Sequence, residues 1–507
     1  MVEQTPGPGS PHPPAVHPPA GAPAGASLGG PLGGGQWPYG PYGESSRQRG
    51  RGRILLLVAV IGGIAACALG ILGFLGFSIG PVALTIGIAA AVLPVPVLVA
   101  CFLWLDRYEP EPVKYLLFCF CWGAFVSTLA SLGVNSGASW LFDRVGLPDS
   151  LVAVLVAPFI EELTKALGPL LLLWRRRREI SGITDGIVYC GLAATGFAMV
   201  ENILYLGGHG YAANADEFGP ASGAQAVVAM FIARILLTGF AHPLFTALTG
   251  VGIGLAARSP RRWVRWVAPA VGMVGAMILH GAWNLMATLT AEAGEPLVFL
   301  YGYFTVMVPI FFGMVGLAIW LRAWEGRLTE RMLPRYATAG WLSPPEVAAM
   351  GSLGRRHAAR AWARRVAGEP GRRAMRTFQF TAMRLALLRD GIERGLDTDH
   401  QQVMRSAAEE WRLLQQLSAS RGVFTGRDPV TPPALWDGRQ YLIVFPDGVR
   451  RAVAAPAAPV VPLPMAPPTP AYAGFAPFPG APGGYPAPTG RYPNPPAGHP
   501  NPPGGWR

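Results

Sequence analysis

The sequence predicts an all-α fold, a polytopic membrane helix bundle of about eight spans. Hydrophobic residues make up 51% of the chain and charged residues only 14%. Apolar runs of about 20 residues recur between residues 54 and 323, and a run of that length crosses a bilayer as a helix that satisfies its own backbone hydrogen bonds. The predicted spans are 54–76, 79–104, 113–135, 149–174, 183–206, 225–257, 264–289 and 296–322.

Composition divides the chain into four regions. Residues 1–52 and 454–507 are rich in Pro and Gly, and we expect them to be disordered cytoplasmic tails. They could recruit cytoplasmic partners, but passive low complexity is the preferred explanation of their composition. Residues 53–323 form the membrane domain, and residues 324–453 form a cytoplasmic, mostly helical region.

Local signals place helix starts and a hairpin in the region 324–453. Ser343 and Glu346 have the spacing of a capping box, which predicts a helix start at that point. Thr398 and Gln401 repeat this spacing ahead of a second helix. The run 439–453 predicts a hairpin of two short strands, which turns around Pro446, Asp447 and Gly448.

The basic residues give an orientation in the membrane. They gather before the first span and in alternate loops: Arg47, Arg49, Arg51 and Arg53; Arg107 and Lys114; Arg175, Arg176, Arg177 and Arg178; Arg258, Arg261, Arg262 and Arg265. The intervening loops contain only one basic residue, Arg144. The positive-inside rule therefore predicts an integral protein of the plasma (inner) membrane with both termini in the cytoplasm. The formal charge of +12 reflects this topology and contact with the lipid bilayer, so we expect no nucleic-acid partner.

Three ionisable side chains lie inside one of these apolar runs. Glu161, Glu162 and Lys165 fall within the run 151–173, where each charged group costs about 2.5–3.5 kcal/mol at bilayer depth. The spacings i,i+3 and i,i+4 let Lys165 reach either carboxylate. A carboxylate left free could act as a general base. The alternative is a structural ion pair that ties helices together.

The next predicted span adds Phe197, Glu201 and Asn202. Its small residues would let a neighbouring helix approach closely; they are Gly191, Ala193, Ala194 and Gly196. Glu201 lies near the outer end of the span, so an interfacial carboxylate is an alternative reading for this residue.

The two spans that follow add histidines. Arg234, His242 and Thr246 lie on one span, and His280 and Asn284 on the next. An imidazole can bind a metal, move a proton or donate to an oxyanion, and the Asn284 amide can serve as a neutral donor. Two histidines beside three intramembrane glutamates favour a functional site over simple packing.

Taken in order, these motifs resemble the PrsW-type intramembrane proteases over about residues 90–320. The matching residues are Glu161-Glu162-x-x-Lys165, Phe197-x-x-x-Glu201-Asn202, His242 with Pro243 and Thr246, and His280-x-x-x-Asn284. The wider clan includes CAAX prenyl endopeptidases and bacteriocin-processing proteases, whose second motif has His where this chain has Glu201. The resemblance implies an intramembrane endopeptidase that cleaves membrane-anchored proteins, with an anti-sigma factor as the family's best-known substrate.

Two mechanisms fit these residues. In a metalloprotease mechanism, Glu201, His242 and His280 hold a divalent ion such as Zn²⁺, and Glu161 or Glu162 is the base. In a metal-free mechanism, one of these two glutamates and a histidine activate water, while the other histidine and Asn284 stabilise the oxyanion.

The remaining motif residues have assisting roles in either mechanism. Lys165 belongs to the catalytic group, and the supporting residues are Phe197, Asn202, Arg234 and Thr246. Two other functions use the same residue types, a proton-coupled transporter and a non-catalytic membrane scaffold. Transporters often contain internal repeats, and no convincing repeat is present here.

Overall fold

The computed structural model describes residues 43–454, apart from 109, 177–179, 340, 398, 425–426, 428–433, 438 and 445–448. Most of the two tails, 1–52 and 454–507, lies outside these residues. By its contacts the chain divides into two units, Met1–Ile61 and Gly62–Arg507. Within the expected N-terminal tail, residues 43–52 are helical, because α1 begins at Gly43.

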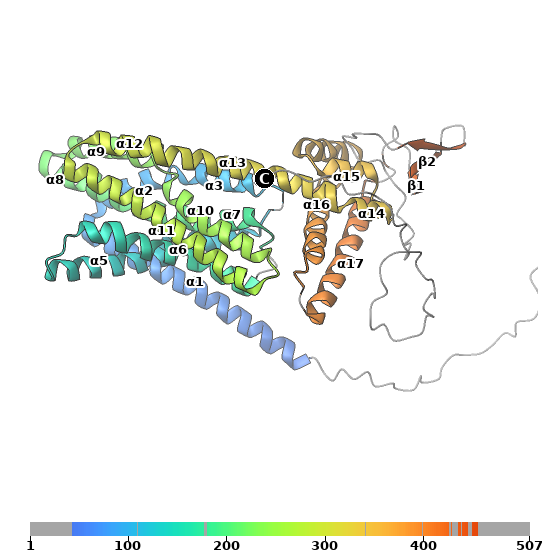
Figure 1. Ribbon diagram of the computed structural model, residues 1–507, viewed down its shortest axis with the longest axis horizontal. Helices are drawn as coiled ribbons and strands as arrows, with labels where there is room; N and C mark the ends of the chain where they lie inside the picture. The colour runs from blue at the N-terminus through green and yellow to red at the C-terminus, as the bar shows by residue number, and fades with distance from the viewer. Residues whose placement is uncertain are drawn as a thin grey trace, which may run out of the picture. The chain divides into compact units, whose positions relative to one another are not determined.

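The described part of the chain is largely helical, which confirms the all-α prediction (Figure 1). The α-helices up to residue 332 are α1 (Gly43–Ile79), α2 (Pro81–Val92), α3 (Val95–Leu105), α4 (Val113–Cys121), α5 (Thr128–Arg144), α6 (Ala157–Arg176), α7 (Ile183–Ile203), α8 (Ala213–Phe218), α9 (Pro220–Phe231), α10 (Ala241–Ala257), α11 (Arg262–Ala293), α12 (Pro296–Gly302) and α13 (Val308–Met332). The π-helical segments are η1 (Trp122–Ser127), η2 (Val152–Val156), η4 (Leu204–Ala212), η5 (Ile232–Leu237) and η6 (Tyr303–Met307).

Seven helices of the described part are long and apolar enough to cross a membrane. They are Ile54–Ile79, Pro81–Leu105, Val113–Arg144, Ile183–Phe218, Pro220–Ala257, Arg262–Ala293 and Leu297–Thr338. The remaining predicted span, 149–174, is also helical, as η2 and α6. It is not one of the seven because it carries Glu161, Glu162 and Lys165, more charge than a simple membrane span tolerates.

Helix α7 is the central helix of the membrane domain, since 83% of its most apolar window is buried. The predicted close approach at its small residues is confirmed. A Cβ on Gly196 would lie 2.1 Å from the carbonyl oxygen of Phe120, and one on Gly191 would lie 2.2 Å from the ring of Phe102. Only glycine fits these two positions, so neighbouring helices pack directly on the α7 backbone.

Helix α10 lies between α7 and α11 and contacts both through glycines. A Cβ on Gly250 would lie 2.4 Å from the carbonyl oxygen of Gly186 in α7. A Cβ on Gly252 would lie 2.2 Å from the carbonyl oxygen of Ala268 in α11. This packing brings the N-terminal end of α10, which carries His242, between the polar residues of its two neighbours.

The region after residue 333 has its own hydrophobic core, to which Tyr336, Trp362, Phe378 and Leu414 contribute. Its helices are α14 (Pro334–Thr338), α15 (Pro344–Met350), α16 (Leu353–Glu393) and α17 (His400–Gly422). The capping box at α15 is confirmed, because the Glu346 amide donates to Ser343 Oγ and the Ser343 amide donates to Glu346 Oε2.

The cap of α17 differs from the prediction. Asp399 is the N-cap, and its Oδ1 accepts from the Gln402 amide at 2.8 Å, one residue later than the expected pair of Thr398 and Gln401. Thr398 itself lies outside the described residues. The shift has a simple reason, since Asp399 and Gln402 have the same three-residue spacing and an aspartate is an equally good cap.

Three short strands follow, β1 (Ala434–Trp436), β2 (Gln440–Val444) and β3 (Arg450–Ala454). They form an antiparallel sheet in the order β1-β2-β3, with Tyr441 opposite Val453. The predicted hairpin is confirmed by β2 and β3, and its turn lies outside the described residues. Strand β1 was not predicted.

Candidate functional site

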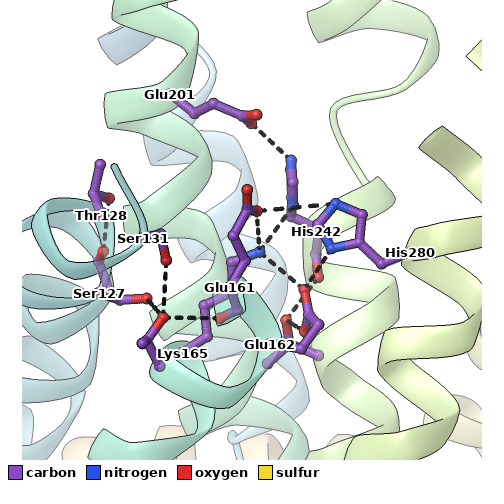
Figure 2. Close-up of polar contacts among 12 residues, drawn as sticks. Ser127, Thr128, Ser131, Glu161, Glu162, Lys165, Glu201, His242 and His280 are labelled. Carbon is purple, nitrogen blue, oxygen red and sulfur yellow. Dashed lines mark hydrogen bonds and ion pairs between the residues drawn. The ribbon is translucent and has the colours of Figure 1, made fainter. Parts of the chain in front are cut away.

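Residues from four helices of the membrane domain meet in one polar cluster (Figure 2). Its members are Glu161, Glu162 and Lys165 on α6, Glu201 on α7, His242 on α10 and His280 on α11. Figure 2 shows their side chains pointing toward one another from helices far apart in the sequence. The cluster therefore brings together the ionisable residues that the sequence placed on separate spans.

Lys165 is the cation at the centre of the cluster, and its side chain is fully buried. Its Nζ donates to Glu161 Oε2 at 3.2 Å and to Glu162 Oε1 at 2.9 Å. The same atom lies 3.2 Å from His242 Nδ1 and 3.9 Å from the ring centroid of Phe197. One ammonium thus holds both carboxylates of α6 and contacts an aromatic face, which attracts a cation further.

Glu162 is fully buried and hydrogen-bonded through both oxygens. Oε2 accepts from Thr246 Oγ1 at 2.7 Å, and Oε1 lies 3.0 Å from His280 Nδ1 and 2.9 Å from Lys165 Nζ. A carboxylate held in this way fixes its neighbours in place and has little capacity left for a reaction.

Glu161, in contrast, faces a cavity of about 530 Å³ that His242, His280 and Glu201 also line. Its Oε2 lies 3.9 Å from His280 Nε2, and its Oε1 accepts from Asn135 Nδ2 at 3.4 Å. Of the two neighbouring glutamates, Glu161 is therefore the one that can meet a water molecule or a substrate.

Asn135, on α5, is a site residue that the sequence reasoning missed. It lines the cavity and contacts Glu161. The run SLGVNSGAS at 131–139 is unusually polar for a membrane helix, and this signal could have pointed to it.

Glu201 is paired on two sides. Its Oε2 lies 2.8 Å from His242 Nε2 and accepts from Arg234 Nη2 at 3.1 Å. Arg234 also donates through Nε to Asn202 Oδ1 at 3.3 Å, and its guanidinium lies 3.5 Å from the ring centroid of Tyr205. Glu201 thus links the histidine of α10 to an arginine on η5.

The side chains that could hold a metal ion together are Glu161, His242 and His280, whose ligand atoms lie within 4.8 Å of one another. This set differs from the expected one, in which Glu201 is the third ligand. Glu201 instead pairs with Arg234 and His242. Two imidazoles and one carboxylate are a ligand set of catalytic zinc sites, and a carboxylate on the far nitrogen of a ligand histidine, as Glu162 is on His280 Nδ1, orients such a ligand.

Asn284 lies one helical turn beyond His280 and lines the same cavity. Its Nδ2 donates to the carbonyl oxygen of Ala153 in η2 at 2.8 Å. The other predicted residues lie in the cluster or on the wall of its cavity, except Thr246, which contacts Glu162, and Asn202, which contacts Arg234.

Comparison with known protein sequences points to one family. The model of the PrsW family intramembrane metalloproteases matches residues 111–314, a stretch that contains every residue of the cluster. No solved structure matches the chain significantly.

Two curated proteins are similar over most of their own length. The chain is 30% identical to Protease PrsW of Geobacillus kaustophilus (strain HTA426) over 212 residues, which cover 39% of this chain and 80% of that protein. It is 28% identical to Protease PrsW of Bacillus subtilis (strain 168) over 202 residues, 40% of this chain and 82% of the relative. Since the similarity spans most of these relatives, and the family match contains the whole polar cluster, the chain belongs to the PrsW family of intramembrane proteases.

Proposed function

We propose that the chain is an endopeptidase that hydrolyses peptide bonds of membrane-anchored proteins at the cavity lined by Glu161, His242 and His280. The observation that carries this proposal is the unequal environment of the two adjacent glutamates. Both carboxylates accept hydrogen bonds on both oxygens, but Glu162 is fully buried, whereas Glu161 lines the cavity. One carboxylate therefore positions the site, and the other acts in it.

Glu161 is placed to take a proton from a water molecule in the cavity. The water oxygen then adds to the scissile carbonyl carbon, and the proton is returned to the leaving amine as the peptide bond breaks. Because His280 Nδ1–H donates to Glu162, His280 Nε2, 3.9 Å from Glu161 Oε2, can donate to the developing oxyanion only when the ring is protonated on both nitrogens. Lys165 donates hydrogen bonds to Glu161 and Glu162, and these ion pairs hold the Glu161 carboxylate in place and balance its charge.

The donor set also fits a catalytic metal ion, and Glu161, His242 and His280 would hold it. A zinc ion held there would supply a Lewis acid that polarises the scissile carbonyl and makes water more acidic. In that case Glu161 serves as a ligand, and Glu201, which lines the same cavity, is the carboxylate left to accept a proton.

The proposed substrate is a single-span membrane protein, and an anti-sigma factor is the candidate that the resemblance implies. We further propose that the protein lies in the plasma membrane with both termini in the cytoplasm, a proposal that the distribution of arginines supports. The Pro-rich tails, which lie outside the family match, are candidate docking segments for cytoplasmic partners.

The test uses the purified full-length chain in liposomes with a panel of single-span proteins that includes anti-sigma factors. We expect cleavage by the wild type and a drop in kcat of about 10²- to 10⁴-fold for Glu161→Gln. Glu217→Gln, an exposed glutamate outside the cavity, is the matched control and should cleave normally. Equal cleavage by wild type and Glu161→Gln would remove the catalytic assignment.

Metal analysis of the same samples distinguishes the two mechanisms. If the centre holds zinc, wild-type protein contains about one zinc per chain, and His242→Ala and Glu161→Gln lose it. Full activity in metal-depleted wild-type protein would select the metal-free mechanism.

A further inference from the structure

The cavity extends well beyond the polar cluster. It follows one face of α11 from His280 to Ala291, eleven residue steps, or about 16 Å at the helical rise of 1.5 Å per residue. Helix α5 also lines it, through Ser131, Asn135 and Ser139. The cavity is thus a groove between two helices that leads to Glu161.

The length of the groove indicates how long a substrate segment it can hold. An extended chain of about five residues has the same length at 3.3 Å per residue. The groove is therefore long enough for an extended peptide segment of about five residues.

An extended segment at membrane depth needs hydrogen-bond partners, because its backbone N–H and C=O groups have left the helix that satisfied them. The hydroxyls of α5 nearest the cluster are already engaged. Ser131 Oγ bonds to Thr164 Oγ1 at 3.0 Å, and Thr128 Oγ1 donates to the carbonyl oxygen of Gly123 at 3.0 Å. Asn135 is different, because Nδ2 donates to Glu161 while Oδ1 is buried without a partner among the described residues.

We propose that Asn135 Oδ1 accepts a hydrogen bond from a main-chain N–H of the substrate, which binds as an extended segment in the groove between α5 and α11. This inference rests on the proposed function and names its substrate class, membrane proteins that unwind readily near the scissile bond. The Asn135 amide joins the two parts of the site, since its nitrogen holds Glu161 and its oxygen holds the peptide beside it.

The test is a double-mutant cycle between enzyme and substrate backbone. Synthetic single-span peptide substrates in detergent carry one amide-to-ester replacement each, at positions flanking the scissile bond, and each replacement removes one N–H donor. In the wild type we expect one position at which the ester raises KM by about 2- to 10-fold. In Asn135→Leu, KM for the all-amide substrate is already raised, and the same ester changes it by less than twofold.

Ser136→Leu, an exposed position next to Asn135 on α5, is the matched control and keeps the wild-type ester profile. If Asn135→Leu does not purify as a folded protein, Asn135→Ala takes its place, because it only shortens a side chain that lines the cavity. Identical ester profiles in wild type and Asn135 variants would overturn this inference while leaving the protease activity in place. Absence of any cleavage by the wild type would instead overturn the proposed function, and this inference with it.

Discussion

Lys165 contacts more of the candidate site than any other single side chain described above. Its ammonium lies within 3.2 Å of Glu161, Glu162 and His242. A compact ammonium fits this position, whereas an arginine would bring a planar fork of five donors that needs more room. This explains why an Arg-rich chain keeps a lysine here. Its other lysine, Lys114, is exposed.

Replacing Lys165 by Met should destabilise the protein and abolish cleavage. Two adjacent carboxylates would lose their buried counter-charge, and removing one partner of a buried ion pair costs about 3–5 kcal/mol. Thermal unfolding in detergent, followed by tryptophan fluorescence, measures the loss. Lys114→Met, the same change at an exposed position, should leave the unfolding temperature within about 1 °C of the wild type.

A second substitution tells a charge effect from a packing effect. If charge is the cause, Lys165→Met combined with Glu162→Gln recovers most of the lost stability, because the uncompensated negative charge is removed. The double variant should still not cleave, since the cluster lacks its cation. An unfolding temperature no higher than that of Lys165→Met alone would show that packing dominates.

The sequence singles out individual candidate site residues for a physical reason. Charged side chains within lipid-like runs are costly, so Glu161, Lys165 and His280 stand out. Periodicity gives the face of one helix, but not how that helix is rotated against its neighbours. For this reason the side chains close enough to share a metal ion include Glu161, where Glu201 was expected. Asn135 was missed because a neutral amide at the end of a span is a weak signal.

At the scale of whole helices, the site depends on how α10 is held. Gly250 and Gly252 face opposite neighbours, α7 and α11, and both contacts are backbone to backbone. Only glycine permits this approach, which sets the distance between Glu201 on α7 and His242 on α10. A displacement of α10 would separate the histidines from α6.

Gly250→Ala should therefore reduce cleavage and stability together. The added Cβ would lie 2.4 Å from a carbonyl oxygen of α7, so the helices must move apart. We expect a cost of about 1–3 kcal/mol, as for other overpacked cores, and a fall in kcat. The measurement pairs thermal unfolding with initial rates of cleavage. Gly137→Ala, a helical glycine of α5 whose added Cβ would meet nothing within 4 Å, is the matched control.

Helix positions were easier to predict than helix interruptions or short strands. Long apolar runs predict spans because the bilayer demands about 20 apolar residues. The break between α2 and α3 falls at Leu93 and Pro94, inside the predicted span 79–104. Strand β1 has only three residues, too few for a period-two pattern, and it became a strand through pairing with β2.

For the whole molecule, orientation determines which side of the membrane supplies the substrate. Along α11, His280 lies about 27 Å from the Arg262 end and about 20 Å from the Ala293 end. The groove extends from His280 toward Ala293. If the arginine-rich loops are cytoplasmic, the groove opens toward the outer half of the membrane, and the substrate is cut on its extracytoplasmic side.

Cysteines at the two ends of α11 test this orientation. Arg261 precedes the helix and Glu292 lies in its last turn, and both are exposed. In intact cells, a membrane-impermeant maleimide should label Glu292→Cys, whereas Arg261→Cys should react only after permeabilisation, because positive charge is retained on the cytoplasmic side. The unsubstituted chain, with its own five cysteines, gives the background labelling. The opposite labelling pattern would place the groove on the cytoplasmic side, and the proposed extracytoplasmic cleavage would then be wrong.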